Sequence, residues 1–333
     1  MKISVVIPSA RAPDVFPECL ASVFHDDDGP LEVIIVDDAM DDHAYRIVTE
    51  SAEKHPVWIL DSRGRGVSAA RNAGACSAAG DVILFMDTDV VLRPGAFRII
   101  RNALRDPGID GIVGIQAANL RFTGFFSRWK NHWMRFTYHR LSGNIHLFYT
   151  SCAVIRKDVF IASGGFDETY RLPSIEDTVF GSRLGRLKRV IRPEPCFEVE
   201  HVKAYGFRSV LATDRKRSSA LVRYAMRNVL AGHDSGAGDT SVPTGFMLSA
   251  GMMILFLLSG LATILGEGVI GSMLMAGSIS AVWLLNIDWL AYLRRVQGPG
   301  FMAGAMLFLP VDLLWVIAGI VQGSIGFALG RKY

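Results

Sequence analysis

Two aspartates stand one residue apart at the end of an apolar run. The run from Val82 to Met86 has the length of a buried strand, and Asp87 and Asp89 follow it. Two like charges this close repel each other unless a positive charge lies beside them. Mg²⁺ and Mn²⁺ favour carboxylate oxygens and commonly bind through one or two of them together with substrate phosphates. The pair therefore predicts a site where Mg²⁺ or Mn²⁺ holds a diphosphate and neutralises charge on the departing oxygen.

Other acids follow a second short strand. Residues 2–8 and 31–38 are β-branched runs, and the second run closes with Asp37 and Asp38. Apolar residues at helical spacing lie between such runs, and this alternation is typical of a parallel sheet covered on both faces. Ligands of these sheets bind outside the carboxyl ends of the strands. We therefore expect acids from separate strands to converge at one edge.

The same reading extends over the first 202 residues. Strands are expected at 57–60, 81–87, 111–120 and in the first part of 148–160, and helices at 15–24, 44–55, 66–80 and 174–187. Residues 190–202 are expected at a sheet edge, because Pro193 and Pro195 lack the backbone N–H that a central strand needs for its hydrogen bonds. The fold class is therefore α/β.

Six motifs in this part of the chain occur in the order and spacing of the family 2 glycosyltransferases. They are VVIPSA (5–10), VDDAMDD (36–42), GVSAARNAG (66–74), GDVILFMDTDV (80–90), GGFDE (164–168) and IEDTVFGSRL (175–184). The resemblance implies the GT-A fold, a nucleotide-sugar donor, a divalent metal ion and, for most of the family, inversion at the sugar. One departure is that Ala39 and Met40 stand where the family usually has Gly-Ser, which makes the geometry of that turn an open question.

The resemblance also implies residue roles. Pro8, Ser9 and Ala10 would line the nucleotide pocket, Asp38 and Asp37 would bind the base, and Arg71 would lie near the base or the diphosphate. Asp87 would face the ribose and the metal, and Asp89 would ligate the metal. His201 would reach the metal or the diphosphate, and Asp177, beside Glu176, would be the catalytic base.

The separate positions of the metal ligand and the base also agree with what an inverting displacement requires. Such a reaction needs a base on the sugar face opposite the leaving diphosphate, so metal and base must come from different parts of the chain, as Asp89 and Asp177 do. The alternatives are structural: Glu176 and Asp177 as favourable acids at a helix N-terminus, His201 as a capping residue, and Arg71 as a helix-surface cation.

Charge almost disappears after residue 243. Only Glu267, Asp288, Arg294, Arg295 and Asp312 interrupt residues 244–329. Apolar segments of about twenty residues span a bilayer, so we expect about three helices, near 246–265, 269–290 and 301–329; two spans with a re-entrant piece is the alternative. Arg294 and Arg295, in the second expected loop, favour a cytoplasmic catalytic domain, and the start of the chain lacks a signal-peptide pattern.

Two basic stretches link the halves. Residues 121–140 mix arginines with aromatic residues, which suits a helix in the lipid headgroup layer; the alternative is an aromatic helix packed on the sheet. Residues 203–227 carry seven basic residues against Asp214 alone and would lie on anionic lipid. A membrane-tethered chain makes nucleic acid an unsuitable partner. The expected organisation is 1–202 as the GT-A domain, 203–243 as an interfacial segment and 244–333 as the transmembrane region.

The sequence thus predicts a membrane-anchored inverting glycosyltransferase with a lipid-linked or membrane-proximal hydroxyl acceptor. One alternative is a polyprenyl-phosphate glycosyltransferase, whose acceptor is the lipid phosphate. Another is an inactive nucleotide-binding membrane scaffold.

Overall fold

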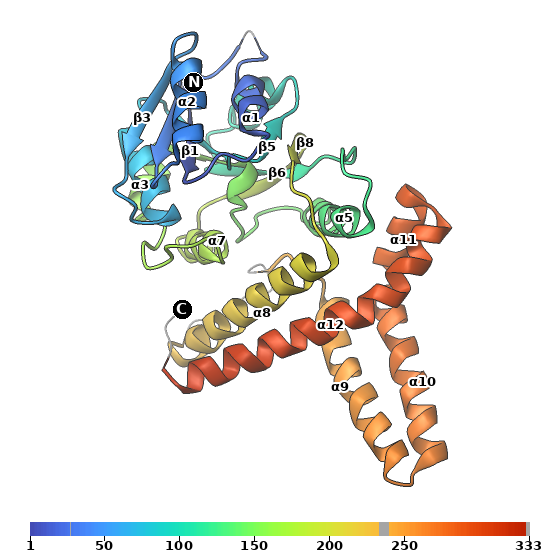
Figure 1. The fold of residues 1–333 in the computed structure, drawn as a ribbon. Helices are drawn as coiled ribbons and strands as arrows, with labels where there is room; N and C mark the ends of the chain where they lie inside the picture. The colour runs from blue at the N-terminus through green and yellow to red at the C-terminus, as the bar shows by residue number, and fades with distance from the viewer. Residues whose placement is uncertain (27, 233–239, 331–333) are drawn as a thin grey trace. The chain divides into compact units, whose positions relative to one another are not determined.

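The computed structural model describes residues 1–26, 28–232 and 240–330, which form two compact units (Figure 1). The first comprises residues 1–122 and 138–204, with a short piece that ends at Ser241. The second comprises residues 123–137, 205–232 and 242–330. Residues 123–137 thus group with the C-terminal helices, although they lie inside the segment 1–202 that was expected to form one domain.

The first unit is built on a mostly parallel sheet of eight strands. They are β1 (Ile3–Ser9), β2 (Glu32–Asp37), β3 (Val57–Asp61), β4 (Val82–Phe85), β5 (Val90–Leu92), β6 (Gly111–Gln116), β7 (Ala153–Arg156) and β8 (Ile191–His201). Their order is β3-β2-β1-β4-β7-β6-β8-β5. The antiparallel pairs are β4–β7, β6–β7 and β5–β8, and the other pairs are parallel.

Helices cover both faces of this sheet. They are α1 (Phe16–Val23), α2 (Asp42–Ala52), α3 (Val67–Ser77), α4 (Ala96–Ala103), α6 (Lys157–Ala162) and α7 (Glu176–Arg186), with a 3₁₀ turn, η1 (Thr150–Cys152). On one face, α3 packs so closely that a Cβ at Gly74 would lie 2.5 Å from a methyl of Val6. Ile3, Val5 and Ile7 point to the other face and are fully buried as well. The expected α/β fold with both faces covered is therefore confirmed.

The expectation of an edge at residues 190–202 is wrong. β8 lies inside the sheet, between β6 and β5. Its pairing with β5 covers only Val199 to His201, whereas Pro193 pairs with Val113 of β6 alone. The prolines are tolerated because the missing N–H groups fall where the strand has one neighbour, next to an irregularity in the register.

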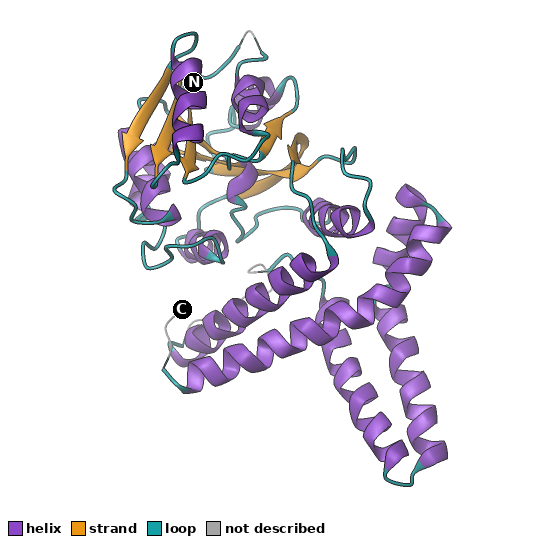
Figure 2. Cartoon of the chain, viewed as in Figure 1, coloured by secondary structure: helices purple, strands orange, loops and turns teal. Residues whose placement is uncertain are grey.

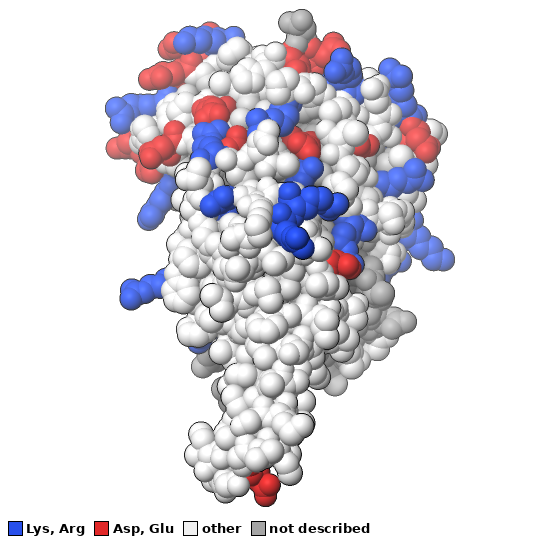
Figure 3. Space-filling view, turned by 90° about the vertical axis from the view of Figure 1, so that its right-hand side faces the viewer, with Lys and Arg blue, Asp and Glu red and all other residues white. Residues whose placement is uncertain are grey.

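The second unit is helical (Figure 2). Its helices are α5 (Phe125–His139), α8 (Phe207–Leu230), α9 (Thr244–Ile264), α10 (Gly268–Leu285), α11 (Ile287–Gln297) and α12 (Pro299–Ala328). Within the described residues, α9, α10 and α12 are long and apolar enough to cross a membrane. α9 and α10 form an antiparallel hairpin, because Gly271 packs on Ser259 and Gly245 packs on Leu285. The narrow column in Figure 3, white except for an acid at its tip, is this hairpin.

The expected loop around Arg294 and Arg295 is instead the helix α11. Asn286 ends α10, and its side chain donates to the Ser249 hydroxyl and to a carbonyl of its own helix. Asp288 in the first turn and the two arginines in the last turn favour the helix dipole. Sequence reading overlooked α11 because its charges interrupt the apolar pattern of the spans.

α5 packs against the C-terminal helices. Trp129 lies edge-to-face with Trp289 of α11 at 5.5 Å and with Phe308 of α12 at 5.1 Å. Phe125 lies 4.7 Å from Phe301. Such aromatic pairs each contribute about 0.5–1.5 kcal/mol beyond the burial of their surface. The aromatic side chains of residues 121–140 therefore hold the second unit together.

Candidate active site

The carboxyl ends of four strands meet at one edge of the sheet. Ser9 pairs with Asp37, and Asp37 pairs with Asp61. Phe85, at the end of β4, pairs with Val6 of β1, so that Asp87 follows at the level of these residues. The predicted convergence of acids from separate strands is therefore present.

A buried arginine joins this edge to α7. Arg71 of α3 is 2% exposed and donates one hydrogen bond to Asp87 Oδ1 and one to Glu176 Oε1, each at 2.8 Å. The other oxygen of Asp87 accepts from the Ser151 hydroxyl at 2.6 Å, and that of Glu176 accepts from the Ser174 backbone N–H at 2.8 Å. Arg71 thus supplies the positive charge beside Asp87 within the protein itself. The two residues are sixteen positions apart, and no sequence pattern indicates their contact.

These contacts keep both Asp87 and Arg71 charged. Burial opposes the charged form of Asp87, but Arg71 and the Ser151 hydroxyl outweigh it, so the pKa of Asp87 is lowered. Burial likewise acts to lower the pKa of Arg71, and its two carboxylate partners raise it overall. The result is a group of fixed charges in which one guanidinium bridges two carboxylates through one charge-assisted hydrogen bond to each.

Asp89 and His201 form a second pair at the same edge. His201 Nε2 lies 3.1 Å from Asp89 Oδ1, and its other nitrogen lies 3.4 Å from the amide of Gln116. Both residues are placed by the β5–β8 pairing, in which Val90 faces His201. Gln116 and Ser151 were not among the predicted site residues, because nothing in their local sequence marks them as functional.

The donor set of this pair fits a divalent cation. Asp89 Oδ1 and His201 Nε2 are in direct contact at 3.1 Å, so a divalent cation held by both would replace this contact and would gain a carboxylate oxygen and an imidazole nitrogen as ligands. Within the described residues no group of three or more His, Cys, Asp or Glu side chains could hold a metal ion. Binding through two protein ligands leaves the remaining positions to substrate phosphates and water, which is the usual manner of Mg²⁺.

The predicted nucleotide-binding residues lie around the turn after β2. Asp38 accepts hydrogen bonds from the Ser62 hydroxyl at 3.1 Å and from the Gly66 N–H at 2.9 Å, and its own N–H donates to the Ser9 carbonyl. Asp37 accepts from the Met40 N–H at 2.6 Å. Ala39 has a φ of 68°, the left-handed conformation that glycine adopts without strain. Ala39 therefore adopts here a backbone conformation that suits the glycine usual at this position in the family.

The first strand contributes a buried polar atom to the same region. Ser9 is 1% exposed, and its hydroxyl has no hydrogen-bond partner among the described residues. Pro8 beside it is half-buried, and Ala10 is exposed. A buried hydroxyl without a partner costs free energy unless a ligand satisfies it.

Asp177 lies in the first turn of α7, next to Glu176. Its Oδ1 accepts from the Thr178 N–H at 2.7 Å and is close to the Thr178 hydroxyl at 3.2 Å. The side chain is largely buried. Because Glu176 is tied to Arg71 and Arg71 to Asp87, the position of Asp177 is fixed relative to the strand edge by one continuous set of hydrogen bonds.

Known proteins share this sequence pattern and this fold. Residues 4–164 match the profile of glycosyl transferase family 2. Two similar curated proteins are the uncharacterized glycosyltransferase YibD of Escherichia coli (32% identity over 33% of this chain and 32% of that protein) and the undecaprenyl-phosphate 4-deoxy-4-formamido-L-arabinose transferase of Pectobacterium carotovorum (33% identity over 35% and 37%). The match thus spans about a third of these relatives' length.

Two solved structures share the fold. A mannosyltransferase from Pyrobaculum calidifontis, in complex with GDP-Man and Mn²⁺, has a TM-score of 0.61 at 16% identity and covers 99% of this chain and 88% of that one. S. aureus TarS, in complex with UDP-GlcNAc, has a TM-score of 0.51 at 15% identity and covers 100% and 93%. The N-terminal part of this chain therefore matches glycosyl transferase family 2 over residues 4–164 and shares the GT-A fold of these structures, and three helices apolar enough to span a membrane follow it.

Proposed function

We propose that the chain is a membrane-anchored inverting glycosyltransferase that moves a sugar from a nucleotide-diphosphate donor to a lipid-linked or membrane-proximal hydroxyl group. The observation that carries the proposal is the chain of contacts from Asp87 through Arg71 to Glu176. These contacts hold the carboxylate of Asp87, beside the proposed metal site, in a fixed position relative to the N-terminus of α7, which carries Asp177. An inverting displacement needs a leaving-group site and a base held in fixed relation in this way.

The donor's nucleotide would lie against the turn after β2. Asp38 would accept from the base, and the buried Ser9 hydroxyl would gain the partner that it lacks in the protein alone. The structural neighbours were solved with GDP-Man and UDP-GlcNAc, which supports a nucleotide-sugar donor here.

Asp89 and His201 would hold Mg²⁺ or Mn²⁺, with Asp87 beside them. The ion supplies charge neutralisation at the diphosphate when bound. Arg71 would act as a positioning residue, because both of its outer nitrogens are engaged by carboxylates. Asp177 would take the proton of the acceptor hydroxyl.

A second function is supported by the relatives. The similar protein from Pectobacterium carotovorum is an undecaprenyl-phosphate transferase, so the acceptor here is alternatively a polyprenyl phosphate. A phosphate oxygen needs little deprotonation before it attacks. In both cases the apolar helices would keep the acceptor and the active site at one membrane, with the catalytic domain in the cytoplasm.

Asp177→Asn distinguishes the two acceptors. A hydroxyl acceptor predicts a fall in kcat of about 10²–10⁴, the usual contribution of a general base, whereas a phosphate acceptor predicts a change below about tenfold. Asp158→Asn is the matched control, because Asp158 also lies in a first helical turn and accepts from the next backbone N–H, at 2.8 Å. Transfer is measured with purified full-length protein in lipid, after the donor is identified.

Donor and metal are identified by a thermal-shift panel of nucleotide sugars with and without Mn²⁺. We expect one donor to raise Tm only with metal, and Asp89→Ala to remove that shift. Donor binding without turnover of any acceptor would favour an inactive scaffold. No stabilisation by any nucleotide sugar would contradict the proposal itself.

A further inference from the structure

α8 and α12 of the second unit pack side by side through a row of glycines. A Cβ at Gly319 would lie 2.3 Å from the Arg215 carbonyl oxygen, and one at Gly323 would lie 2.4 Å from that of Ser219. Residue numbers rise together along this contact, so the helices run in the same direction (Figure 1). Small residues allow the two backbones to approach this closely.

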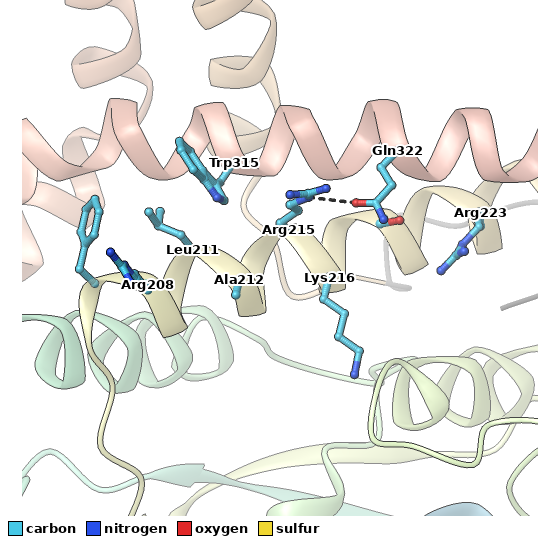
Figure 4. Close-up of a pocket in the computed structure, with 10 residues that line it drawn as sticks. Arg208, Leu211, Ala212, Arg215, Lys216, Arg223, Trp315 and Gln322 are labelled. Carbon is cyan, nitrogen blue, oxygen red and sulfur yellow. Dashed lines mark hydrogen bonds between the residues drawn. The ribbon is translucent and has the colours of Figure 1, made fainter.

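A groove of about 520 Å³ runs along this helix pair, and its charged lining residues are all cations (Figure 4). It is lined by Phe207, Arg208, Leu211, Ala212, Arg215, Lys216, Ser219, Arg223, Trp315 and Gln322. In the described part of the chain, neither Arg208 nor Arg223 forms a hydrogen bond or ion pair, while Arg215 donates to Gln322 at 2.9 Å. The one acid of α8, Asp214, pairs with Lys130 of α5. The groove therefore fits an anionic group.

An apolar hollow adjoins the groove. It measures about 490 Å³ and shares Gln322 with it. The other lining residues are Ala318, Val321, Ile325, Gly326 and Leu329. A cationic groove that continues into an apolar hollow matches a ligand with an anionic head and a hydrocarbon chain.

The charges of α8 also determine how deep the α8–α12 pair can lie in a membrane. Each arginine or lysine at the centre of a bilayer costs roughly 2.5–3.5 kcal/mol by insertion measurements. α8 carries six such residues along the C-terminal half of α12. Trp315, which lines the groove, is of the residue type that gathers at the membrane–water interface. The pair therefore belongs at the level of the headgroups.

We propose that the α8–α12 groove binds the phosphate headgroup of an acidic membrane lipid, whose chain lies in the adjoining hollow. The binding is independent of the proposed reaction, because none of the residues involved belongs to the candidate active site. Arg223, whose guanidinium lies beside Gly326 of the hollow, and Arg215, about two turns before it on α8, supply charge-assisted hydrogen bonds to the phosphate, and Val321 and Ile325 contact the chain.

The test counts lipids retained on the detergent-purified full-length chain by native mass spectrometry, with phosphatidylglycerol as the probe. The double variant Arg215→Ala/Arg223→Ala should weaken binding at least about tenfold for each arginine removed. Arg217→Ala/Arg227→Ala is the matched control: it removes two charges from the same helix outside the groove, and it should bind as the wild type does. Tm is measured for both variants.

Two further probes distinguish the ligand's source. Phosphatidylcholine should bind much more weakly than phosphatidylglycerol, because its headgroup carries no net charge. Glycerol phosphate, which has the phosphate but no chains, should also bind weakly. Equal losses in the two double variants, equal binding of the two lipids, or full affinity for glycerol phosphate would each overturn the proposal.

Discussion

At the scale of single residues, Ala39 is in a conformation that its side chain disfavours. Its φ of 68° costs an L-residue other than glycine about 1–2 kcal/mol. Glycine removes this strain but adds freedom to the unfolded chain. We therefore expect Ala39→Gly to raise the free energy of unfolding by up to about 1 kcal/mol, as measured by thermal or chemical denaturation. Ala52→Gly, at an exposed helical position, should lower it, and a loss in both variants would contradict the assignment of strain.

Arg71 is the residue on which the active-site geometry depends most. Arg71→Met would leave Asp87 and Glu176 without their buried counter-charge, and breaking such a pair costs about 3–5 kcal/mol. Arg65→Met is the control, because its ion pair with Glu168 is about half exposed and contributes little. Denaturation of both variants measures the difference. Similar stabilities would show that Arg71 is not a structural bridge.

At the scale of elements, α5 is tied to α11 through a neutral histidine. Arg128 donates to the Gln297 amide oxygen, which turns the amide nitrogen towards His132 Nε2 at 2.7 Å. Nε2 must then accept, so the proton is on Nδ1, 3.2 Å from the Tyr292 hydroxyl. Burial, with Arg135 and Arg128, lowers the pKa of His132 to about 4.

Because the pKa of His132 is lowered, we expect the free energy of unfolding to decrease in acid. The unfolded state takes up a proton near pH 6.5 and the folded state only near pH 4, so stability falls as the pH falls through this window, by up to about 3 kcal/mol. We expect Tm in detergent to drop between pH 7 and pH 5, and to drop less in His132→Gln. An equal drop in both proteins would assign the effect to other groups.

Sequence reading predicted the elements whose patterns are local and regular. β1, β2 and β4 were found because they are continuous apolar runs, and α9 and α10 because charge is absent from them. The interior position of β8 was missed because its prolines argue against it, and only its partners show where they are tolerated. The link from Asp87 to Glu176 was missed because it depends on a contact across the fold, which no spacing reports.

At the scale of the whole molecule, the packing of α12 on a basic helix bears on membrane topology. If the α8–α12 pair lies among the headgroups, only the α9–α10 hairpin crosses the bilayer, and the chain returns to the side from which it entered. Single cysteines at Glu267, Val296 and Leu329, in a background without native cysteines, test this with a membrane-impermeant label. We expect positions 296 and 329 to be labelled from one side and 267 from the other. Labelling of 329 from the same side as 267 would mean that α12 crosses.

The assignment of α5 to the second unit has a consequence for biosynthesis and for protein engineering. Trp129 leaves the ribosome long before Phe301 and Phe308, and at about 5–20 residues per second the roughly 170 intervening residues take on the order of ten seconds or more. During that time the aromatic face of α5 lacks the side chains of α11 and α12 that pack on it. A gene fragment that stops before α8, made to obtain a water-soluble enzyme, would keep that face uncovered permanently and would yield a protein that precipitates.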